Sequence, residues 1–529
     1  MVARVYLVGA GPGDPELLTE RGARRLAEAD LVLYDALVHP SLLAHAPNAE
    51  HAFVGKRAGR HAERQQQIND RMIAAARAGK TVVRLKGGDP YLFGRGSEEA
   101  EALAAAGIPF EVVPGVPSPL AATAYSGISL THRTLGSSVA YLTATESPSK
   151  DRSSHDWTKL ATATETLVIF MGLGRVRSLM DLLIEHGRSP ETPAAILSRA
   201  STPDQRTLVG TVATLADLAH AESLLSPALI VVGAVVTLRE QLRWYDKGPL
   251  FGARVLVTRP AHQAAGLARR LRDAGAEPIC VPAITIAPPQ DAAPLAMLAR
   301  SLDSYDWVVF TSANGVDALF GALASQQLDA RAFGRTTKVL AIGTATAAAL
   351  ERRGVRADAI PDEFRGEAAA EVLVAALGDG IERAKIAIPR AEIARDALPD
   401  RLRAAGAHVD VVTAYRNVAR AEDQARIAEL LRGGDIDVLT LTAPSTLRSV
   451  LDALGGDVNV LASVLIASIG PVTTEAAIAV GAHVEVTAAT YTEAGLCEAL
   501  LEHAARAGRP WQDPAKRRAR FRATFGAAT

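Results

Sequence analysis

The stretch VYLVGAGPGDPELLT, residues 5–19, decides the fold of the first half of the chain. An apolar, strand-like run leads directly into Gly9, Gly11 and Gly13, which let the backbone turn tightly and approach a ligand closely. The spacing GxGxG lacks the last glycine of the GxGxxG dinucleotide-binding pattern, and no matching acidic residue follows in a clean βαβ unit. The stretch alone therefore fits a ligand-binding loop or a plain turn equally well.

Two further glycine- and proline-rich segments follow. In RLKGGDPYLFGRGSEE, residues 84–99, the triplet Gly87-Gly88-Asp89 follows a strand, and Pro90 prevents the turn from continuing as a helix. Arg95 and Glu98 are three residues apart and would share one face if a helix starts there. The third segment, 113–133, is a loop that ends in a polar Thr-His-Arg triplet.

Residues 136–243 continue with alternating strand-like runs and helical stretches, and from residue 252 to about 505 short β-branched runs alternate with alanine-rich helices. The second alternation predicts βα units and parallel sheets, so we expect an α/β protein. The segment RWYDKGPLFG, 243–252, is polar and turn-rich, and a new apolar strand begins after it. This pattern predicts a linker between a domain over 1–245 and another over 252–505. The tail, 506–529, has seven basic residues against one acid, which favours a solvated, disordered end.

Composition narrows the setting. A chain of 529 residues with 48% hydrophobic and 22% charged residues is expected to form several globular domains. A net charge of −1 argues against a nucleic-acid partner. Cys280 and Cys497 are the only cysteines, so neither a disulfide framework nor a zinc cluster is expected. No signal peptide and no membrane-spanning run are evident, so we expect a cytoplasmic protein without a metal or a membrane partner.

The glycine-rich segments together resemble the tetrapyrrole methylase family, and specifically the uroporphyrinogen-III C-methyltransferases, over about residues 3–245. The resemblance implies two α/β lobes that bind S-adenosylmethionine between them, in a homodimer. It is carried by six motifs in family order: VGAGPGDPELLT, YDALV, VGKRAGRH, RLKGGDPYLFGRG, AYSGISLTHR and TPDQRTLVGT. The cofactor-binding positions that it implies are Gly9, Gly11, Pro12, Gly13, Gly87, Gly88, Asp89, Leu92, Ser118, Met171 and Ala200. Pro117 and Ala200 depart from the residues usual in the family.

Methyl transfer from a sulfonium requires alignment of the carbon nucleophile and a route for the lost proton, but no metal. The resemblance implies Asp35 as proton acceptor and Lys56 as proton donor, whereas related enzymes implicate the positions of Glu98 and Arg95. A turn-capping role for Asp35 and a surface role for Lys56 stay open. The implied substrate carries eight carboxylates, which cationic side chains can pair with. The candidates are Lys56, Arg57, Arg60, Arg95 and Arg133.

The second half resembles uroporphyrinogen-III synthase, which closes hydroxymethylbilane into a ring. The resemblance implies two α/β lobes, the second inserted over about 288–411 between paired linkers. Tyr415 is the implied catalytic residue, and Thr311, Ser312, Ser445 and Thr473 are the implied carboxylate-binding residues. Each hydroxyl has an alternative role as a helix cap, and Tyr415 as packing. The motifs are RVLVTRP, LRDAGAEPICVPAITI, DWVVFTSANGV, IGTATAAAL, VVTAYRN, LTAPSTL and IGPVTTEAA.

The two resemblances fit one another, because the product of the synthase is the substrate of the methyltransferase. They imply a bifunctional enzyme that makes uroporphyrinogen III and methylates it at C2 and C7 to precorrin-2, in the siroheme or cobalamin branch. The alternative is a methyltransferase fused to a catalytically degenerate, ligand-binding or regulatory module.

Overall fold

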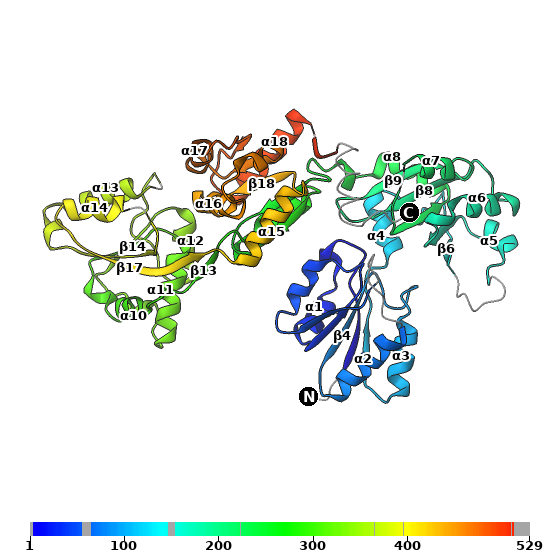
Figure 1. Cartoon of the computed structure of the whole chain (residues 1–529), viewed down its shortest axis with the longest axis horizontal. Helices are drawn as coiled ribbons and strands as arrows, with labels where there is room; N and C mark the ends of the chain where they lie inside the picture. The colour runs from blue at the N-terminus through cyan, green and yellow to red at the C-terminus, as the bar shows by residue number, and fades with distance from the viewer. Residues whose placement is uncertain are drawn as a thin grey trace.

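The computed structural model describes residues 4–55, 65–145, 154–222, 224–363, 365–394, 396–508 and 510–512. Within these ranges the strands form four five-stranded sheets, each covered by helices, so that the chain folds as four successive α/β lobes (Figure 1). We number them lobes 1 to 4, by the sheets that begin with β1, β6, β11 and β13. The predicted α/β class is confirmed.

Lobe 1 contains a parallel sheet in the order β3-β2-β4-β1-β5. All five residues of β1 are buried, because helices cover both faces of a parallel sheet. Val5 and Leu7 belong to one core cluster, whereas Tyr6 and Val8 belong to the other. The elements are β1 (Val5–Gly9), α1 (Glu20–Ala27), β2 (Leu31–Tyr34), β3 (Glu50–Phe53), α2 (Gln65–Arg77), β4 (Val82–Lys86), α3 (Gly96–Ala105) and β5 (Phe110–Val113).

Lobe 2 contains a mixed sheet in the order β6-β7-β10-β8-β9, in which β10 is antiparallel to both of its neighbours. Helix α4 connects lobes 1 and 2. The elements are α4 (Ser118–Ser126), β6 (Val139–Thr143), α5 (Trp157–Ala163), β7 (Thr166–Phe170), α6 (Val176–Glu185), β8 (Pro193–Ser198), β9 (Arg206–Thr211), α7 (Leu215–Glu222), β10 (Ala228–Val232) and α8 (Arg239–Leu242).

Lobe 3 is built from two separate stretches of chain around a parallel sheet in the order β12-β11-β18-β19-β20. Its first stretch holds β11 (Arg254–Val257), α9 (Ala261–Asp273) and β12 (Glu277–Cys280). Its second stretch holds α15 (Ala421–Arg432), β18 (Val438–Leu441), α16 (Pro444–Ala453), β19 (Leu465–Ser468), α17 (Pro471–Ala479), β20 (Val486–Thr487), α18 (Glu493–Ala507) and the 3-10 turn η10 (Pro510–Gln512).

Lobe 4 lies between these stretches and has the sheet order β13-β17-β16-β14-β15. The entering strand β13 pairs antiparallel with the returning end of β17, from Thr285 opposite Val418 to Ala287 opposite Arg416. The elements are β13 (Thr285–Ala287), α10 (Ala293–Arg300), β14 (Trp307–Phe310), α11 (Ala313–Ser325), β15 (Lys338–Ala341), α12 (Thr344–Arg352), α13 (Gly366–Leu377), β16 (Lys385–Ala391), α14 (Ala397–Ala404) and β17 (His408–Val418).

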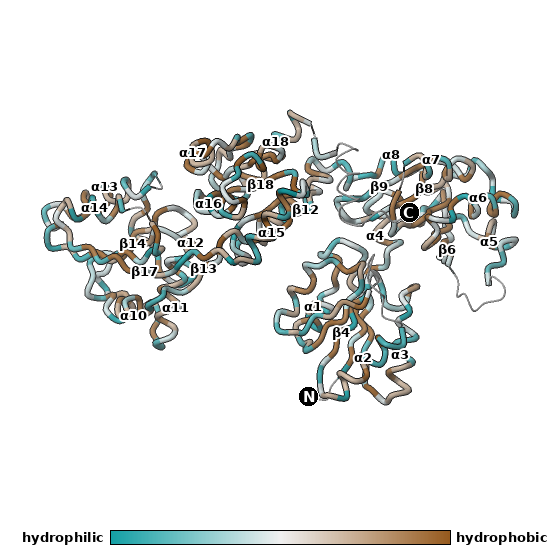
Figure 2. The backbone as a smooth tube through the Cα atoms, viewed as in Figure 1, coloured by the Kyte–Doolittle hydropathy of each residue, from teal (hydrophilic) through white to brown (hydrophobic). Residues whose placement is uncertain are grey.

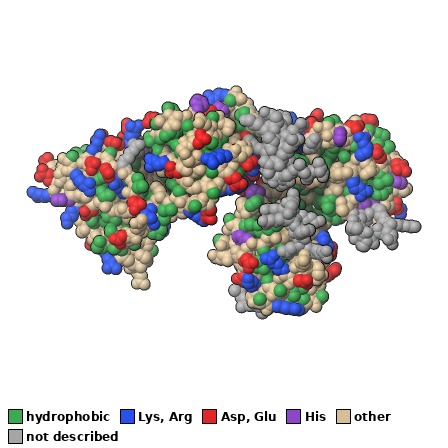
Figure 3. All heavy atoms as spheres, in the orientation of Figure 1, with side chains coloured by type: hydrophobic (Ala, Val, Ile, Leu, Met, Phe, Trp, Pro, Cys, Tyr) green, Lys and Arg blue, Asp and Glu red, His purple; other side chains and the backbone are tan. Residues whose placement is uncertain are grey.

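Hydropathy follows the sheets. Hydrophobic residues line strands such as β4 and β17, whereas the helices carry most of the hydrophilic positions (Figure 2). On the face that Figure 3 shows, basic and acidic side chains are interspersed over the described residues, in keeping with the net charge of −1.

The segment 243–252 connects lobes 2 and 3, and three of its apolar side chains are packed. Tyr245, Leu250 and Phe251 are buried, and the Tyr245 ring packs against Tyr125 of lobe 2 and against Phe251, with centroid distances of 4.8 and 5.4 Å. Its apolar side chains are separated by polar residues in the sequence, but in the fold they pack against lobe 2 and lobe 3. The segment is therefore a packed junction.

The ordered structure also extends past residue 506, where a disordered tail was predicted. Helix α18 continues to Ala507, and the buried Trp511 donates its Nε1–H to the carbonyl oxygen of Phe251 at 3.1 Å. A large aromatic side chain buried in the core of lobe 3 holds this part of the chain in place. Residues 513–529 of the predicted tail lie outside the described residues.

Candidate active sites

Three glycine loops meet at the carboxyl edge of the lobe 1 sheet, because β1 lies between β4 and β5. Gly11 and Gly88 form an antiparallel bridge, in which Gly88 N–H donates to the Gly11 oxygen at 2.8 Å. A Cβ on Gly9 would lie 2.5 Å from the Gly115 Cα, and a Cβ on Gly115 would lie 2.3 Å from the Gly88 oxygen. Only glycine fits at these contacts, so the loops form one compact backbone cradle.

Asp89 fixes two of these loops. Its Oδ1 accepts hydrogen bonds from the N–H groups of Tyr91 and Leu92 at 2.8 and 3.2 Å, and its Oδ2 accepts one from Gly115 N–H at 3.1 Å. Because the described backbone occupies both oxygens, Asp89 orders the cradle. Ser118 begins α4 after Pro117, and a Cβ on Gly88 would lie 3.8 Å from the Ser118 nitrogen. Gly88 itself has a φ of 71°, a conformation that favours glycine.

Lobe 2 brings Met171 and Ala200 to the other side of this cradle. Met171 follows β7 with a φ of 54° and is 52% exposed. The Phe93 ring packs on Phe170, next to Met171, at a centroid distance of 4.7 Å. A Cβ on Gly13 would lie 3.1 Å from the Ala200 oxygen. The glycine loops and the two lobe 2 loops therefore face one another across the seam between the lobes.

A buried charge cluster lies behind Asp35, which follows β2. The Asp35 Oδ1 accepts a 2.6 Å hydrogen bond from Arg84 Nη2, and Arg84 Nε donates to Glu99 Oε1 at 3.0 Å. Lys86 Nζ lies 2.9 Å from the same Glu99 oxygen. The side chains of Arg84, Lys86 and Glu99 are at most 4% exposed, whereas Asp35 is 28% exposed. Burial lowers the pKa of Lys86.

Arg84, Lys86 and Glu99 were not among the residues predicted from the sequence. Every residue of β4 is buried, and two of them are basic. The signal in the sequence is the pair Arg84 and Lys86 within the apolar run VVRLK, because basic residues are seldom buried without a partner. A cation in the interior of a parallel sheet needs a buried carboxylate as partner, and Glu99 on α3 supplies it.

Arg95 and Glu98 lie at the surface, where Arg95 precedes α3 as its N-cap residue and Glu98 lies in its first turn. Arg95 Nε and Nη2 donate to the two carboxylate oxygens of Glu98 at 2.9 and 2.6 Å. These hydrogen bonds lower the pKa of Glu98. Arg133 is exposed in the turn that precedes β6. The remaining predicted basic residues, Lys56, Arg57 and Arg60, lie outside the described residues.

In lobe 4, Tyr415 lies inside β17, which continues through the segment that pairs with β13. The residue is buried in the core of lobe 4, with 7% of its surface exposed. Its hydroxyl oxygen is 3.0 Å from the Ser312 Oγ, and Ser312 in turn caps α11 by accepting Gly315 N–H at 3.2 Å. The ring of Tyr415 is therefore enclosed in the core, and its hydroxyl lies at the N-terminus of α11.

The other predicted hydroxyls differ in accessibility. Thr311, next to Ser312 after β14, and Ser445, in the first turn of α16, are partly exposed, but Thr473 in the first turn of α17 is buried. The neighbouring Thr474 joins a hydroxyl cluster, 2.5 Å from Ser468 Oγ and 2.8 Å from Thr487 Oγ1. The burial of Thr473 favours packing for that residue.

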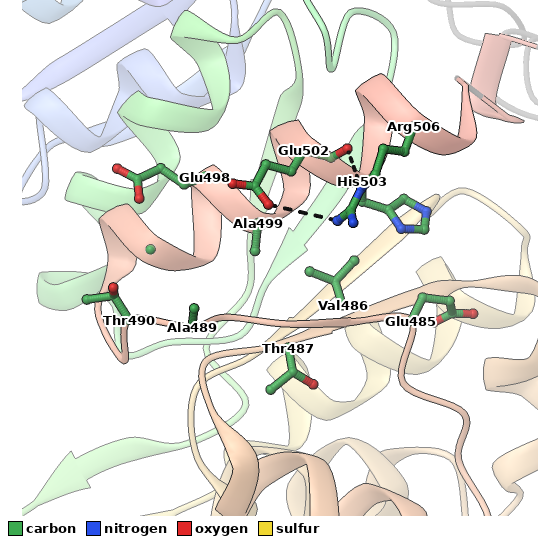
Figure 4. Close-up of a pocket in the computed structure, with 11 residues that line it drawn as sticks. Glu485, Val486, Thr487, Ala489, Thr490, Glu498, Ala499, Glu502, His503 and Arg506 are labelled. Carbon is green, nitrogen blue, oxygen red and sulfur yellow. Dashed lines mark hydrogen bonds and ion pairs between the residues drawn. The ribbon is translucent and has the colours of Figure 1, made fainter.

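A cavity of about 200 Å³ lies beneath α18 in lobe 3 (Figure 4). Glu485, Thr487, Glu498, Glu502 and Arg506 contribute polar atoms to its wall. None of the predicted site residues lines it. Among the residues that the structure describes, no group of three or more His, Cys, Asp or Glu side chains could hold a metal ion, and no helix is long and apolar enough to cross a bilayer.

The fold and its sites define a chain of two enzyme halves, each a pair of α/β lobes. The family model "Tetrapyrrole (Corrin/Porphyrin) Methylases" matches residues 4–216, and "Uroporphyrinogen-III synthase HemD" matches residues 265–498. The chain belongs to the tetrapyrrole methylase family in its first half and to the uroporphyrinogen-III synthase family in its second. The predicted fusion is confirmed, and the protein is a bifunctional tetrapyrrole biosynthesis enzyme.

Curated relatives cover both halves. The chain is 38% identical over 451 residues to the "Porphyrin biosynthesis protein HemD" of Ruminiclostridium josui. This match covers 85% of this chain and 88% of the relative. It is 39% identical over 360 residues to the uroporphyrinogen-III C-methyltransferase of Bacillus subtilis, covering 68% of this chain and 73% of that protein. It is 49% identical over 244 residues to the siroheme synthase of Pseudomonas fluorescens, covering 46% of this chain and about half (52%) of the relative.

Among solved structures, the uroporphyrin-III C-methyltransferase from Thermus thermophilus complexed with S-adenyl homocysteine is 42% identical. The match covers 44% of this chain and 93% of the Thermus thermophilus chain, with a TM-score of 0.38.

Proposed function

We propose that this chain cyclises hydroxymethylbilane to uroporphyrinogen III in lobes 3 and 4, and methylates that product at C2 and C7 to precorrin-2 in lobes 1 and 2. S-adenosylmethionine is the methyl donor, and we propose a homodimer formed through the methylase half. The observation that carries the proposal is the glycine cradle of Gly9, Gly11, Gly88 and Gly115 facing Met171 and Ala200, in a chain whose second half belongs to the synthase family.

The cradle suits a flat, polar cofactor because no side chain projects from its glycines. When bound there, S-adenosylmethionine supplies an electrophilic methyl group. The residues of this chain align the tetrapyrrole and accept the proton that the methylated carbon framework loses. Arg95 and Arg133, with Lys56, Arg57 and Arg60, are proposed to pair with the substrate carboxylates.

Asp35 is the favoured proton acceptor. Arg84 engages one of its oxygens, and in the part of the chain that the structure describes no hydrogen bond reaches the other. Glu98 is the weaker candidate because Arg95 engages both of its oxygens and lowers its pKa, which reduces its strength as a base. Lys56 is retained as the proposed proton donor.

In the synthase half, the Tyr415 hydroxyl is proposed to donate a hydrogen bond to the departing hydroxyl of the bilane. Thr311, Ser312 and Ser445 are proposed to bind carboxylates, together with the first turns of α11 and α16. The burial of Tyr415 and Thr473 favours a second candidate, in which lobes 3 and 4 are a ligand-binding module without activity.

One experiment separates the two candidates. Purified protein is given hydroxymethylbilane under anaerobic conditions, with and without methyl-labelled S-adenosylmethionine, and the products are identified. We expect the type III isomer in both reactions and two labelled methyl groups in the second. Type I product alone would establish the ligand-binding module, and an unlabelled tetrapyrrole would refute the methylation. Light scattering tests the dimer.

A further inference from the structure

A chain of polar side chains crosses from lobe 3 to lobe 4. Arg259 follows β11 and forms an ion pair with Glu493, the first residue of α18. Its Nη2 donates to the Gln263 Oε1 at 3.1 Å, and the Gln263 Nε2 donates to the Asn314 Oδ1 at 3.0 Å. Glu493, Arg259 and Gln263 belong to lobe 3, whereas Asn314 belongs to α11 of lobe 4. Arg259 therefore lies at the seam of the synthase half.

This chain ends beside the candidate synthase site. Asn314 is two residues after Ser312, whose hydroxyl contacts that of Tyr415 at 3.0 Å. On the lobe 3 side, Arg259 follows the carboxyl end of β11, and Ser445 follows the carboxyl end of the neighbouring β18. Ligands of open parallel sheets bind at the carboxyl ends of the strands. Arg259 thus places a cation at the same edge of the lobe 3 sheet as Ser445. The carboxylate-binding residues predicted for the synthase half are all hydroxyl-bearing, so Arg259 adds a positive charge to them.

The surroundings of Arg259 suit an exchangeable carboxylate partner. Its side chain is 20% exposed and that of Glu493 is 28% exposed, so solvent reaches both members of the pair. The Glu493 carboxylate lies close to Gly266 in the interior of α9, where a Cβ would lie 2.5 Å from the Glu493 Oε2. At this position glycine leaves room for the Glu493 carboxylate beside α9.

We propose that Arg259 binds a carboxylate of the tetrapyrrole substrate in the synthase half, and that Glu493 occupies its guanidinium while the site is empty. The fork of an arginine matches a carboxylate in two hydrogen bonds, and the substrate's own carboxylates replace Glu493 as it enters between the lobes. Gln263 keeps the guanidinium directed at the seam. The assignment rests on the proposed synthase function, and it adds a cation to a site for which only hydroxyls were predicted.

The test uses the full chain and two substitutions that should act in opposite directions. Arg259→Gln removes the cation, so we expect the KM for hydroxymethylbilane to rise about tenfold, the value of one lost ionic hydrogen-bonding partner. Glu493→Gln removes the competitor, so we expect the KM to fall by a factor of about two to five. Arg259→Lys keeps the charge but loses the fork and should fall between Arg259→Gln and the unaltered protein.

Arg353→Gln is the matched control, because Arg353 forms a 3.1 Å ion pair with Asp317 on α11 of the same half. Its KM should be unchanged, and methyl transfer should be unchanged in all four variants. If Arg259→Gln and Glu493→Gln both leave the KM unchanged, or both raise it alike, the pair is structural and the proposal is wrong.

A binding measurement keeps this question separate from catalysis. Calorimetry with uroporphyrin III should give two binding events in the unaltered protein, one for each half, and Arg259→Gln should weaken one of them. If the unaltered protein forms only type I product and Arg259→Gln still weakens uroporphyrin III binding, the proposed synthase function is wrong but the carboxylate site stands. Unchanged binding in Arg259→Gln would overturn the site itself.

Discussion

At the scale of single residues, buried charged side chains that do not contact the proposed substrate position the candidate catalytic residue Asp35 in the methylase half. Arg84 is buried between Glu99 and Asp35, and it connects the interior of the sheet to the one member of the cluster that reaches solvent. The charges of Arg84, Lys86, Glu99 and Asp35 balance. The position of Asp35 is therefore determined by a buried network.

This network predicts a large effect for Arg84→Met. The substitution leaves two carboxylates without their shared cation, and breaking a buried ion pair costs about 3–5 kcal/mol of unfolding free energy. Urea unfolding of lobes 1 and 2 should show this loss, and methyl transfer should fall with it. Arg177→Met, which removes an exposed partner of Asp217 in lobe 2, should change stability by less than about 1 kcal/mol. Equal effects of the two substitutions would contradict the buried network.

Tyr415 supports a prediction in the other half. Tyr415→Phe keeps the buried ring and removes only the hydroxyl that meets Ser312, so the protein should fold normally. An oriented donor acting mainly in the transition state is worth about two to three orders of magnitude, and here less, because the bilane also cyclises unaided. We expect the synthase rate to fall about tenfold or more, with methyl transfer unchanged. A Tyr415→Phe protein with normal synthase kinetics would leave Tyr415 as a packing residue.

At the scale of elements, the junction 243–252 belongs to both halves. Leu250 and Phe251 lie in or beside the core of lobe 3, and Tyr245 packs against Tyr125 on α4. Tyr125 in turn donates its hydroxyl to the Asp14 Oδ2 at 2.7 Å, directly after the glycine loop. The Arg272–Glu16 ion pair, at 2.9 Å, joins α9 to the same region. The second half thus contacts the back of the candidate cofactor loop.

The junction determines where the halves can be separated. A fragment that starts at Gly252 lacks Leu250 and Phe251, and removing a large apolar side chain from a core costs about 2–5 kcal/mol. This fragment should be insoluble or melt well below a fragment that starts at Arg243, when both end at residue 512. Circular dichroism melting curves of the two fragments make the comparison. Equal melting temperatures would show that the junction is dispensable for lobe 3.

At the scale of the whole molecule, each candidate site is built from one half of the chain. The methylase site draws on lobes 1 and 2, and the synthase site on lobes 3 and 4. Fusion ensures that the two halves are present in equal amounts.

This division predicts complementation between two defective proteins. Asp35→Asn should form uroporphyrinogen III without methylating it, and Tyr415→Phe should methylate added uroporphyrinogen III but cyclise the bilane slowly. An equimolar mixture should restore the labelled, twice-methylated product at about the rate of the intact protein at half its concentration. Mass spectrometry of a time course measures it. If the mixture is no faster than Tyr415→Phe alone, the two activities depend on a shared chain.

The sequence by itself determined the class of fold and the glycine turns that follow some of its strands. These features depend on local geometry: apolar β-branched runs form buried strands, and glycine is needed where the backbone turns tightly or approaches another segment. The same local patterns carried the two resemblances, and so the families.

Only the tertiary structure decided which polar groups are buried and what they contact. Arg84 meets Glu99, Gln263 meets Asn314 across two lobes, and Tyr415 is enclosed in a core, although none of these pairings has a local sequence pattern. The composition of 243–252 predicted a linker but not its packing, since burial depends on what the two neighbouring lobes place around Tyr245 and Phe251. A side chain's environment is created by segments distant along the chain, and only the folded arrangement brings them together.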